Sequence, residues 1–591
     1  MTKNFFKIFP RSALVLFALG FLGSCTSKNK EAEAVLRIPI VADAKNFDPI
    51  FAEDRHSNYV NDLVYECLVE YDYLKRPATL RPSLAASWEV SKDGLTYTFK
   101  LKPGVKYIDH KVFEGGKGRD VVAKDVVYSF LRLADPKLNS PGFWLFDGHI
   151  VGINAWREKN KNAATTDYAN PPEGIKALDD STVQLKVVQK YPQLLYVLAM
   201  SYASVIPPEA VEKLGKDFVN EPVGTGPYKL VRWSRNSKIE FERNPTFHGD
   251  AYPTEGEAED MAKGRLADAG KALPIIPRLE LQVYVESTPQ WLNFLKGELD
   301  ISGIPKDYYK GVIDPKTQEL TPEFAEKNLT LQKVVEPDVT YIAFNLDDPT
   351  IKKGGPNLRK AISLAINHPK ELELFYNGRG IQAQSPLPPT VAGYDKDFKN
   401  PYKEYNVEKA KEYLKKSGFP NGVEIAYEST QGTDSRQMAE MLKADLEVIG
   451  VKLTINVNQF SELSQKLNTK KAQMWGIAWG GDYPDAENFL QLLYGPNSAP
   501  GPNASNYNNP KYNSLYVKMR GMADSPERRK IISEMVQIST EDAPWVPGIH
   551  RIVYSLQQPW LKNYKADNPN TGATGAEYLN LDMERKKQGV K

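Results

Sequence analysis

Residues 423–479 read VEIAYESTQGTDSRQMAEMLKADLEVIGVKLTINVNQFSELSQKLNTKKAQMWGIAW, and their pattern indicates the fold class. Short apolar runs alternate with longer segments whose apolar residues recur at helical spacing. The pattern predicts strands at 423–427, 451–457 and 472–479, separated by helices at 435–449 and 460–467. Because a crossover helix joins strands that run in the same direction, this order predicts a parallel sheet and an α/β fold.

Patterns outside this stretch predict further local structure. Two alternating runs at 87–90 and 96–99 flank the turn signal Lys-Asp-Gly at 92–94 and predict a β-hairpin. Apolar residues at helical spacing predict a helix over 123–133. Asn406 is placed to cap another helix that follows it. The chain therefore combines an antiparallel region with a parallel α/β region.

Size and charge limit the class of protein. A chain of 591 residues is too long for one hydrophobic core and should divide into at least two lobes. The net charge is only +2, which favours neither nucleic acid nor an anionic membrane surface as a partner. The chain has 2 cysteines, Cys25 and Cys67. Cys67 lies in an apolar run and is expected to be a small buried side chain, so no intrachain disulfide is predicted if Cys25 is modified.

The amino-terminal end has three successive parts. Lys3, Lys7 and Arg11 form a basic start, and residues 13–22 form an apolar run that is too short to span a bilayer. Small residues then lead to Cys25. This arrangement resembles a bacterial lipoprotein signal peptide, which implies cleavage before Cys25 and attachment of acyl chains, palmitate among them, to the new terminus.

On this interpretation, residues 1–25 are the signal peptide and residues 26–34 form a flexible tether to an exported, membrane-anchored body. An ordinary secretory signal with an incidental cysteine is the alternative. Thr26 is not the aspartate that retains some lipoproteins on the inner membrane, so whether the inner or the outer membrane carries the anchor stays open. Beyond the signal, charged residues interrupt the strongest apolar runs, and no second membrane segment is predicted.

A series of short motifs extends along the mature chain. They are NFDP at 46–49, PSLAASWE at 82–89, DGLTYTF at 93–99, AKDVVYSF at 123–130, VGTGPY at 223–228, RNP at 243–245, GELD at 297–300 and WGGDYPD at 479–485. Any one of them could occur by chance. In this order the series resembles the extracellular solute-binding proteins of peptide and nickel ABC transporters, known as family 5, over nearly the whole mature chain.

The resemblance implies a two-lobed periplasmic-binding-protein fold of the Venus-flytrap type, in which two α/β lobes close on a ligand by hinge motion. The first lobe is expected at 35–338 plus 554–591, with an additional subdomain at about 71–208, and the second lobe at 339–553. Residues 255–273 are rich in Ala, Gly, Glu, Lys and Asp and depart from the family pattern. They are interpreted as a surface insertion whose role is open.

The resemblance also implies a ligand site at the end of the last predicted strand. A peptide offers an ammonium, backbone amides and a carboxylate, and an exposed strand edge with a fixed carboxylate can bind the first two. In oligopeptide-binding members the aspartate three residues after the tryptophan holds the ligand ammonium, which implies Asp482 here. Ala478, Trp479 and Gly480 are the expected strand contacts. The alternative is a simple turn, with either Asp482 or Asp485 bonded to nearby amides and Trp479 in the core. If Asp482 holds the ligand, Asp485 is expected to be structural and to orient the loop.

Two other positions bear on the ligand. The resemblance implies that Glu53 faces the cleft as a second acidic contact, because the matching stretch of peptide receptors lies at the interlobe surface; a solvated loop carboxylate is at least as good an interpretation. Position 476, where some relatives carry a basic residue, is a glycine. A partner for a peptide carboxylate is therefore unassigned, and ligand length stays open.

No motif predicts catalysis or a cofactor. The chain lacks a His-Glu-x-x-His motif, a nucleophile elbow and a Walker loop, and its 6 histidines have no metal-ligand spacing. The predicted function is that of a monomeric lipoprotein that captures peptides between its lobes and delivers them to an ABC permease and its ATPase. The alternatives are the same fold binding nickel, haem or an oligosaccharide, and a surface interaction lipoprotein that does not feed a transporter.

Overall fold

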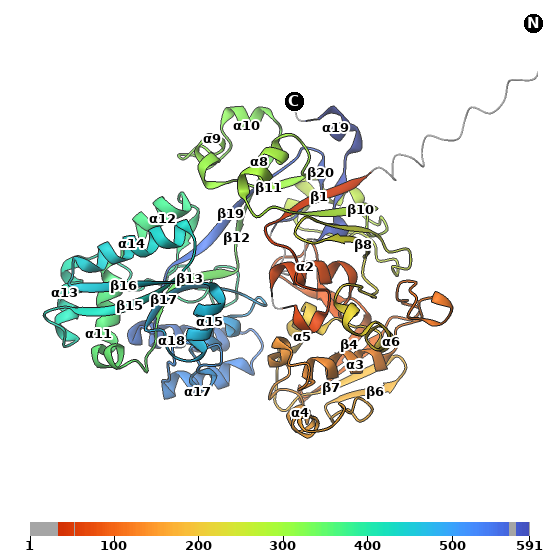
Figure 1. Cartoon of the computed structure of the whole chain (residues 1–591), viewed down its shortest axis with the longest axis horizontal. Coiled ribbons are helices and arrows are strands. Elements are labelled where there is room, and N and C mark those ends of the chain that lie inside the picture. The colour runs from red at the N-terminus through yellow and green to blue at the C-terminus, as the bar shows by residue number, and fades with distance from the viewer. Residues whose placement is uncertain (1–33, 53, 567–574, 590–591) are drawn as a thin grey trace, which may run out of the picture.

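The structure of the protein is a computed structural model that describes residues 34–52, 54–566 and 575–589. The predictions for Cys25 and Glu53 lie outside the described residues, as does all but the last residue of the proposed tether. Within the described ranges, no helix is both long and apolar enough to cross a membrane. Figure 1 shows two α/β bodies beside each other, with strands passing between them near the top of the view.

The stretch 423–479 forms much of the body on the left of Figure 1, here called the second lobe. Its elements are β15 (Val423–Thr430), α14 (Thr433–Glu447), β16 (Val451–Asn458), α15 (Phe460–Asn468) and β17 (Met474–Gly480). Strands β16 and β17 both run parallel to β15, so the predicted parallel order is confirmed. Strands β13 (Asp338–Phe344) and β18 (Trp545–Pro547) complete the sheet in the order β16-β15-β17-β13-β18.

Helices pack on both faces of this sheet. Because successive residues of a strand point to opposite faces, Met474 and Trp475 of β17 join two different apolar clusters. The helices of the second lobe, besides those already given, are α11 (Pro349–Ala365), α12 (His368–Tyr376), α13 (Val407–Lys416), α16 (Ala486–Leu490), α17 (Pro510–Arg520) and α18 (Pro526–Asp542). The Asn406 side chain accepts a hydrogen bond from the Lys409 amide, which confirms the predicted cap of α13.

The first lobe is built on a sheet in the order β1-β10-β9-β8. Its elements are β1 (Val35–Ile40), α2 (Arg55–Val64), α6 (Pro208–Leu214), β8 (Tyr228–Ser234), β9 (Lys238–Arg243), β10 (Arg278–Val283), α8 (Ser287–Leu295), β20 (Leu561–Lys562), β21 (Asn580–Leu581) and α19 (Met583–Gln588). Strand β1 joins β10 in parallel, while the other pairs are antiparallel. The sheet therefore brings the start of the described chain beside residues more than 200 positions later.

A second sheet, at the lower right of Figure 1, belongs to the same body. Its elements and those near it are β2 (Val69–Tyr71), β3 (Leu80–Pro82), β4 (Ala85–Val90), β5 (Thr96–Leu101), α3 (Ala123–Ala134), α4 (Ile153–Lys161), β6 (Ile175–Asp179), β7 (Thr182–Lys186) and α5 (Leu194–Val197). The antiparallel β4–β5 pair and the helix α3 confirm the predicted hairpin and helix. Arg132 of α3 donates to both carboxylate oxygens of buried Asp48, at 3.0 and 2.9 Å.

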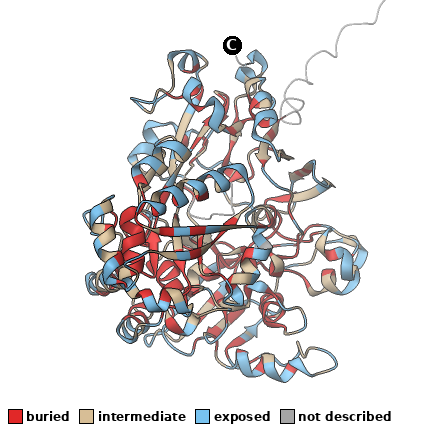
Figure 2. Ribbon diagram, turned by 60° about the vertical axis from the view of Figure 1, so that its left-hand side comes forward, coloured by how far each residue is buried: buried red, intermediate tan, exposed pale blue. Residues whose placement is uncertain are grey.

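Cys67 has the environment that the sequence predicted. Its side chain is buried in the apolar cluster of this body, and its Sγ donates to the Met200 carbonyl oxygen at 3.3 Å. Burial raises the pKa of the Cys67 thiol well above its ordinary value. The thiol is therefore neutral and unreactive at physiological pH. Figure 2 shows that buried residues in general lie along the strands and the inward faces of the helices.

Two long strands pass between the lobes. Strand β12 (Thr330–Val335) leads through Pro337 into β13, and β19 (Ile549–Gln557) returns beside it (Figure 1). The elements near them are β11 (Ile301–Gly303), α9 (Tyr309–Val312), α10 (Pro322–Glu326) and β14 (Gly380–Gln382). Residues 552–557 of β19 pair with β12, and residues 549–551 pair with β14 of the second lobe. One continuous strand thus carries the hydrogen-bonded connection from one lobe to the other.

Residues 255–273 lie on the first lobe and contain the helix α7 (Ala258–Ala262). Most of the segment is exposed, as a surface insertion requires. Asp260, Arg265 and Asp268 nevertheless have buried side chains that turn toward the protein. The segment is therefore bonded to its surroundings by charged side chains, which the sequence interpretation did not include.

Candidate functional site

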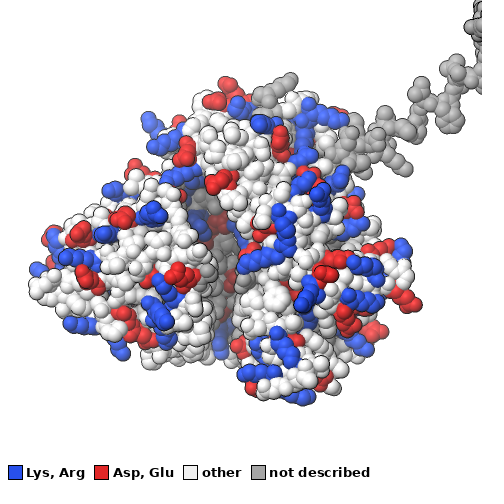
Figure 3. Space-filling model, in the orientation of Figure 1, with Lys and Arg blue, Asp and Glu red and all other residues white. Residues whose placement is uncertain are grey.

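A cavity of about 610 Å³ lies between the two lobes. Residues 38–41, 76–78 and 564–566 line it from the first lobe. Gly481 and Tyr483 line it from the second lobe, immediately before and after Asp482. Figure 3 shows a hollow between the lobes, with acidic and basic side chains interspersed around it. The volume falls in the range of sites that enclose small ligands.

Asp482 is held in place by a buried amide. The Asn488 Nδ2 donates to Asp482 Oδ2 at 2.9 Å, and the Asp482 backbone N–H donates to Asn488 Oδ1 at 3.1 Å. The same Oδ1 accepts a bond from the Trp479 indole N–H at 3.0 Å. The structure therefore brings Trp479 and Asp482 together through Asn488, a residue that the sequence analysis missed. The only sequence signal for Asn488 was an amide side chain placed shortly after the motif at 479–485.

Asn488 is itself positioned by its helix. Asp485 caps α16 by accepting a hydrogen bond from the Glu487 amide at 2.7 Å. The same oxygen, Asp485 Oδ1, also accepts a hydrogen bond from the buried guanidinium of Arg528, whose Nη2 donates at 2.6 Å. Asp485 is thus a structural residue, and it orients the helix that holds Asn488.

The Asp482 carboxylate has no basic partner among the described residues. Burial raises the pKa of Asp482 to about 6, although the hydrogen bond from Asn488 acts in the opposite direction. Close by, the buried hydroxyl of Tyr71 has no hydrogen-bond partner in the part of the chain that the structure describes. Burial raises the pKa of Tyr71, and the Tyr196 hydroxyl and the Asp482 carboxylate raise it further. A cationic ligand group would stabilise the ionised form of Asp482.

A row of three tyrosines joins the lobes beside this carboxylate. The rings of Tyr71 and Tyr196 are stacked with centroids 6.2 Å apart and planes 15° apart. Tyr483 of the second lobe stacks on Tyr196 at 6.3 Å with planes 2° apart. Tyr483 is buried and belongs to the apolar cluster of the first-lobe body. The two lobes are therefore in contact on this side of the cavity.

The end of β17 offers an open backbone edge. Strand β13 pairs with β17 along its whole length, up to Gly480, whereas β15 pairs with β17 only at Met474 and Trp475. Among the described strands, no other strand pairs with this edge of residues 476–480. The predicted contacts Ala478, Trp479 and Gly480 all lie on this edge segment. Unpaired edges of this kind accept an added strand.

The glycine at position 476 has a steric reason. A Cβ atom built on Gly476 would lie 2.3 Å from the hydroxyl oxygen of Tyr427. Tyr427 therefore occupies the space that a larger side chain would need. A basic residue, as some relatives carry here, would require the Tyr427 side chain to move.

A smaller cavity of about 350 Å³ lies against the same edge, within the second lobe. Ala478 lines it, together with Tyr427 and the apolar side chains of Phe375, Met438 and Met441. His368 also lines it, and its buried Nε2 has no hydrogen-bond partner in the described structure. Burial lowers the pKa of His368 to about 4, so the ring is neutral near pH 7.

The structure thus distributes the predicted residues over one region. Ala478 lines the smaller cavity. Trp479, Gly480 and Asp482 line neither cavity, although residues next to them in the sequence line one or the other. No cluster of His, Cys, Asp and Glu suitable for a metal ion occurs among the described residues. The geometry offers an uncompensated carboxylate, an open strand edge and two cavities, and these are binding features.

Two lobes joined by crossing strands around a ligand-sized cavity define a two-lobed binding protein of the periplasmic type. Comparison with known families then gives the particular group. The family model for bacterial extracellular solute-binding proteins, family 5 Middle, matches residues 79–501, and the chain belongs to this family. The family consists of solute-binding proteins rather than enzymes, and membership implies that the chain is exported.

Individual relatives bind different ligands. The chain is 28% identical to heme-binding protein A of Haemophilus influenzae, over 88% of this chain and 87% of that protein. It is 26% identical to the dipeptide-binding protein of Escherichia coli, over 82% of this chain and 83% of that protein. A solved structure of the ABC transporter-associated periplasmic binding protein DppA from Helicobacter pylori, in complex with the peptide STSA, matches with a TM-score of 0.74 and 25% identity. That match covers 94% of this chain and 100% of the other.

Proposed function

We propose that this protein is the substrate-binding lipoprotein of an ABC importer, which captures peptides between its lobes and delivers them to a membrane permease. The observation that carries the proposal is the Asp482 carboxylate, which has no basic partner in the described structure and stands at the end of an open strand edge. The peptide-binding relatives from Escherichia coli and Helicobacter pylori support the same ligand class.

The amino terminus of a peptide would bind Asp482. An ammonium group beside a partly desolvated carboxylate forms a charge-assisted hydrogen bond, which is stronger than a neutral one. The unpartnered hydroxyl of Tyr71 lies near enough to Asp482 for the carboxylate charge to raise its pKa. Its oxygen would accept a second hydrogen bond from the same ammonium.

The backbone of the peptide would pair with residues 476–480 of β17. Main-chain hydrogen bonds of this kind give affinity without dependence on ligand side chains. Side chains alternate along such a strand, and one set of them would point toward the smaller cavity, which Gly476, Ile477 and Ala478 line. The smaller cavity, with Phe375, Met438 and Met441, suits an apolar ligand side chain.

The carboxylate of the peptide requires a cation, and Arg55 is the best candidate. Arg55 is exposed, lines the larger cavity and makes no ion pair with the part of the chain that the structure describes. Lys565 also lines this cavity, but its ammonium already contacts Glu257 and Asp260. Arg55→Ala should weaken the binding of peptides with a free carboxylate and leave C-terminally amidated peptides unaffected.

The decisive test is calorimetric titration with a pool of short synthetic peptides and with their N-acetylated forms. Peptides should bind, and acetylation should abolish most of the affinity because it removes the ammonium. Equal binding of free and acetylated peptides would exclude Asp482 as the ammonium partner. Mass spectrometry of ligands released by denaturing the purified protein would identify the natural ligand, and a sugar or a metal complex in that extract would replace the peptide.

Haem is the second candidate ligand, because the relative from Haemophilus influenzae is named for it and because His368 Nε2 lacks a partner at the smaller cavity. A neutral imidazole is a haem ligand. Titration with haem, followed by absorbance, would decide between the two. A spectral shift that His368→Ala abolishes would support haem, and its absence would leave peptides as the ligand.

The lipid anchor at Cys25 completes the proposal. An anchored receptor remains close to its permease, so transfer needs only a weak docking interface. Labelling with radioactive palmitate should mark the wild-type chain and not the Cys25→Ser variant, which should be released from the membrane. If peptides bind but are not taken up by cells in a manner that depends on this protein, the alternative of a surface interaction lipoprotein would be favoured.

A further inference from the structure

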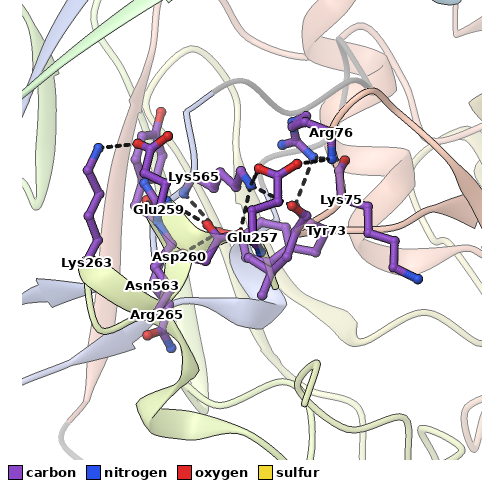
Figure 4. A network of polar contacts seen from close by, with 12 residues as sticks. Tyr73, Lys75, Arg76, Glu257, Glu259, Asp260, Lys263, Arg265, Asn563 and Lys565 are labelled. Carbon is purple, nitrogen blue, oxygen red and sulfur yellow. Dashed lines mark hydrogen bonds and ion pairs between the residues drawn. The ribbon is translucent and has the colours of Figure 1, made fainter. Parts of the chain in front are cut away.

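Residues 255–273 contact two parts of the cavity wall that are remote from them in the sequence. Residues 76–78 and 564–566 both line the interlobe cavity. Figure 4 shows the side chains that join these three segments, with Glu257, Asp260 and Lys565 at the centre. The arrangement differs from that of an insertion that only covers the surface.

Glu257 binds both parts of the wall with one carboxylate. Its Oε1 accepts a hydrogen bond from the backbone N–H of Arg76 at 2.8 Å. Its Oε2 accepts a bond from the Nζ of Lys565 at 3.1 Å. Lys565 also donates to the Leu74 carbonyl oxygen at 2.5 Å. Glu257 and Lys565 therefore connect the two wall segments to each other and to the insertion.

Asp260 holds Lys565 in this connection through a second carboxylate. Its carboxylate is fully buried and accepts bonds from Lys565 Nζ at 3.0 Å and from Arg265 Nη1 at 2.7 Å. It also accepts a bond from the Glu257 backbone N–H at 3.0 Å, which caps α7. Arg265 in turn donates through Nε to the Tyr564 carbonyl oxygen at 3.1 Å. The buried Asp260 carboxylate is thus paired with two cations, as a buried charge requires.

A second connection lies beside the first. The Tyr73 hydroxyl donates to the Asn563 carbonyl oxygen at 2.6 Å and accepts a bond from the Lys565 backbone N–H at 3.1 Å. The Asn563 amide donates to Asp268 Oδ2 at 2.7 Å. The insertion therefore contacts Asn563, just before the wall segment 564–566, and Tyr564 and Lys565 within it. Because three consecutive residues make these contacts, the segment has little freedom to move independently of the insertion.

We infer that residues 255–273 are a positioning element that fixes the first-lobe wall of the interlobe cavity, and that they thereby determine which peptide lengths the cavity accepts. The effect on peptides rests on the proposed function, whereas the effect on the wall does not. Glu257 and Asp260 do not line the cavity themselves. They act through the backbone at Arg76 and through Tyr564 and Lys565, which do line it.

The test compares two variants of the full chain with two matched controls. Asp260→Asn and Glu257→Ala remove the two carboxylates of the network. The controls Asp125→Asn and Glu209→Ala remove similar carboxylates around Arg119. Like Asp260, Asp125 is buried, is paired with an arginine and takes part in a helix cap. Its Oδ2 accepts a hydrogen bond from the Val122 backbone N–H at 3.0 Å. The Glu209 side chain is 31% exposed and that of Glu257 is 36% exposed. The control residues line neither cavity.

The first readout is hydrogen–deuterium exchange, which needs no ligand. Both network variants should accelerate exchange in residues 74–76 and 564–566 by about threefold or more, because each loses hydrogen bonds that hold these segments. The control variants should leave exchange there unchanged, even where they lower the thermal stability. Unchanged exchange in both network variants would overturn the inference.

The second readout is the ratio of dissociation constants for synthetic peptides of two, three, four and five residues, measured on the full chain in detergent. The network variants should change this ratio by about threefold or more, and the controls should lower all affinities equally or not at all. Faster exchange with an unchanged ratio would overturn the part that concerns length selection. If the wild-type chain binds no peptide, the proposed function fails, while exchange still decides whether the insertion positions the wall.

Discussion

The side-chain amide of Asn488 donates a hydrogen bond to the Asp482 carboxylate at 2.9 Å and fixes it at the end of β17. The same amide, fully buried, accepts bonds from the Asp482 backbone and from the Trp479 indole. One side chain thus joins a strand end, a turn and a short helix. The position of the Asp482 carboxylate, the proposed ligand-binding group, depends on this contact more than on the turn itself.

Asn488→Ala should therefore affect both stability and binding. Removing a buried group that satisfies three partners should lower the free energy of unfolding by about 1–3 kcal/mol. Chemical denaturation measures this loss, and calorimetry should show weaker binding because Asp482 is no longer oriented. Gln491→Ala, in the following turn and with only one weak side-chain bond at 3.4 Å, is the control and should change neither quantity measurably. A fully stable Asn488→Ala variant would contradict the role given to this amide.

Peptide affinity should depend on pH through Asp482, whose pKa is raised from 3.8 to about 6 in the folded protein. The ionised carboxylate binds an ammonium, so affinity should fall about tenfold for each pH unit below 6 and level off above it. Titrations between pH 4.5 and 8 measure this profile. In Asp482→Asn the profile should be flat over the same range, and a wild-type profile equally flat would exclude Asp482 as the anchor.

The same shift has a consequence for stability. Between pH 3.8 and about 6 the folded protein holds a proton on Asp482 that the unfolded chain has released. Stability therefore decreases as the pH rises through this window, because the unfolded state binds fewer protons. Comparing wild type with Asp482→Asn by denaturation at pH 4 and pH 7 isolates this contribution. The stability of the variant relative to wild type should be higher at pH 7 than at pH 4. The opposite order would contradict the raised pKa of Asp482.

Tyr196→Ala should shift the lobes toward an open arrangement. The Tyr196 ring stacks between Tyr71 and Tyr483, and stacked aromatic pairs contribute about 0.5–1.5 kcal/mol each beyond the area that they bury. Distances between fluorophores placed on the two lobes should increase on average, and ligand affinity should fall by about two- to tenfold. Tyr196→Phe keeps the ring and should behave as wild type. If both variants show the wild-type distance distribution, the tyrosine row does not contribute to closure.

The buried pair of Asp48 and Arg132 should be important for stability and irrelevant to ligand chemistry. Both side chains are 4% exposed, so Asp48→Ala leaves an unpaired buried cation and should cost about 3–5 kcal/mol. Glu158→Ala removes an exposed pair with Lys161 and should leave stability nearly unchanged. Replacing both buried partners with apolar residues, as Asp48→Leu with Arg132→Met, should recover most of the loss. An equally large loss in the double variant would show that the pair contributes more than mutual neutralisation.

Much of the fold could be predicted because its signals are local. The alternation of runs in 423–479 predicted β15, β16 and β17 and their parallel direction, and the turn at 92–94 predicted the β4–β5 hairpin. Periodicity reflects which side of an element is buried, and a single element is enough to show it. Asn488 was missed for the opposite reason. Nothing in its neighbours indicates that its amide reaches back to Trp479.

The sequence by itself determined the α/β class, the succession of parallel strands and helices along residues 423–479, and the position of Asp482 within a family motif. Only the tertiary structure decided that Asp482 lacks a basic partner among the described residues, that Tyr427 fills the space at Gly476, and that Lys565 meets Asp260 across 305 positions of the chain. Helix and strand patterns repeat every few residues and can be read locally. Contacts between distant segments depend on how whole lobes pack, and no local period encodes them.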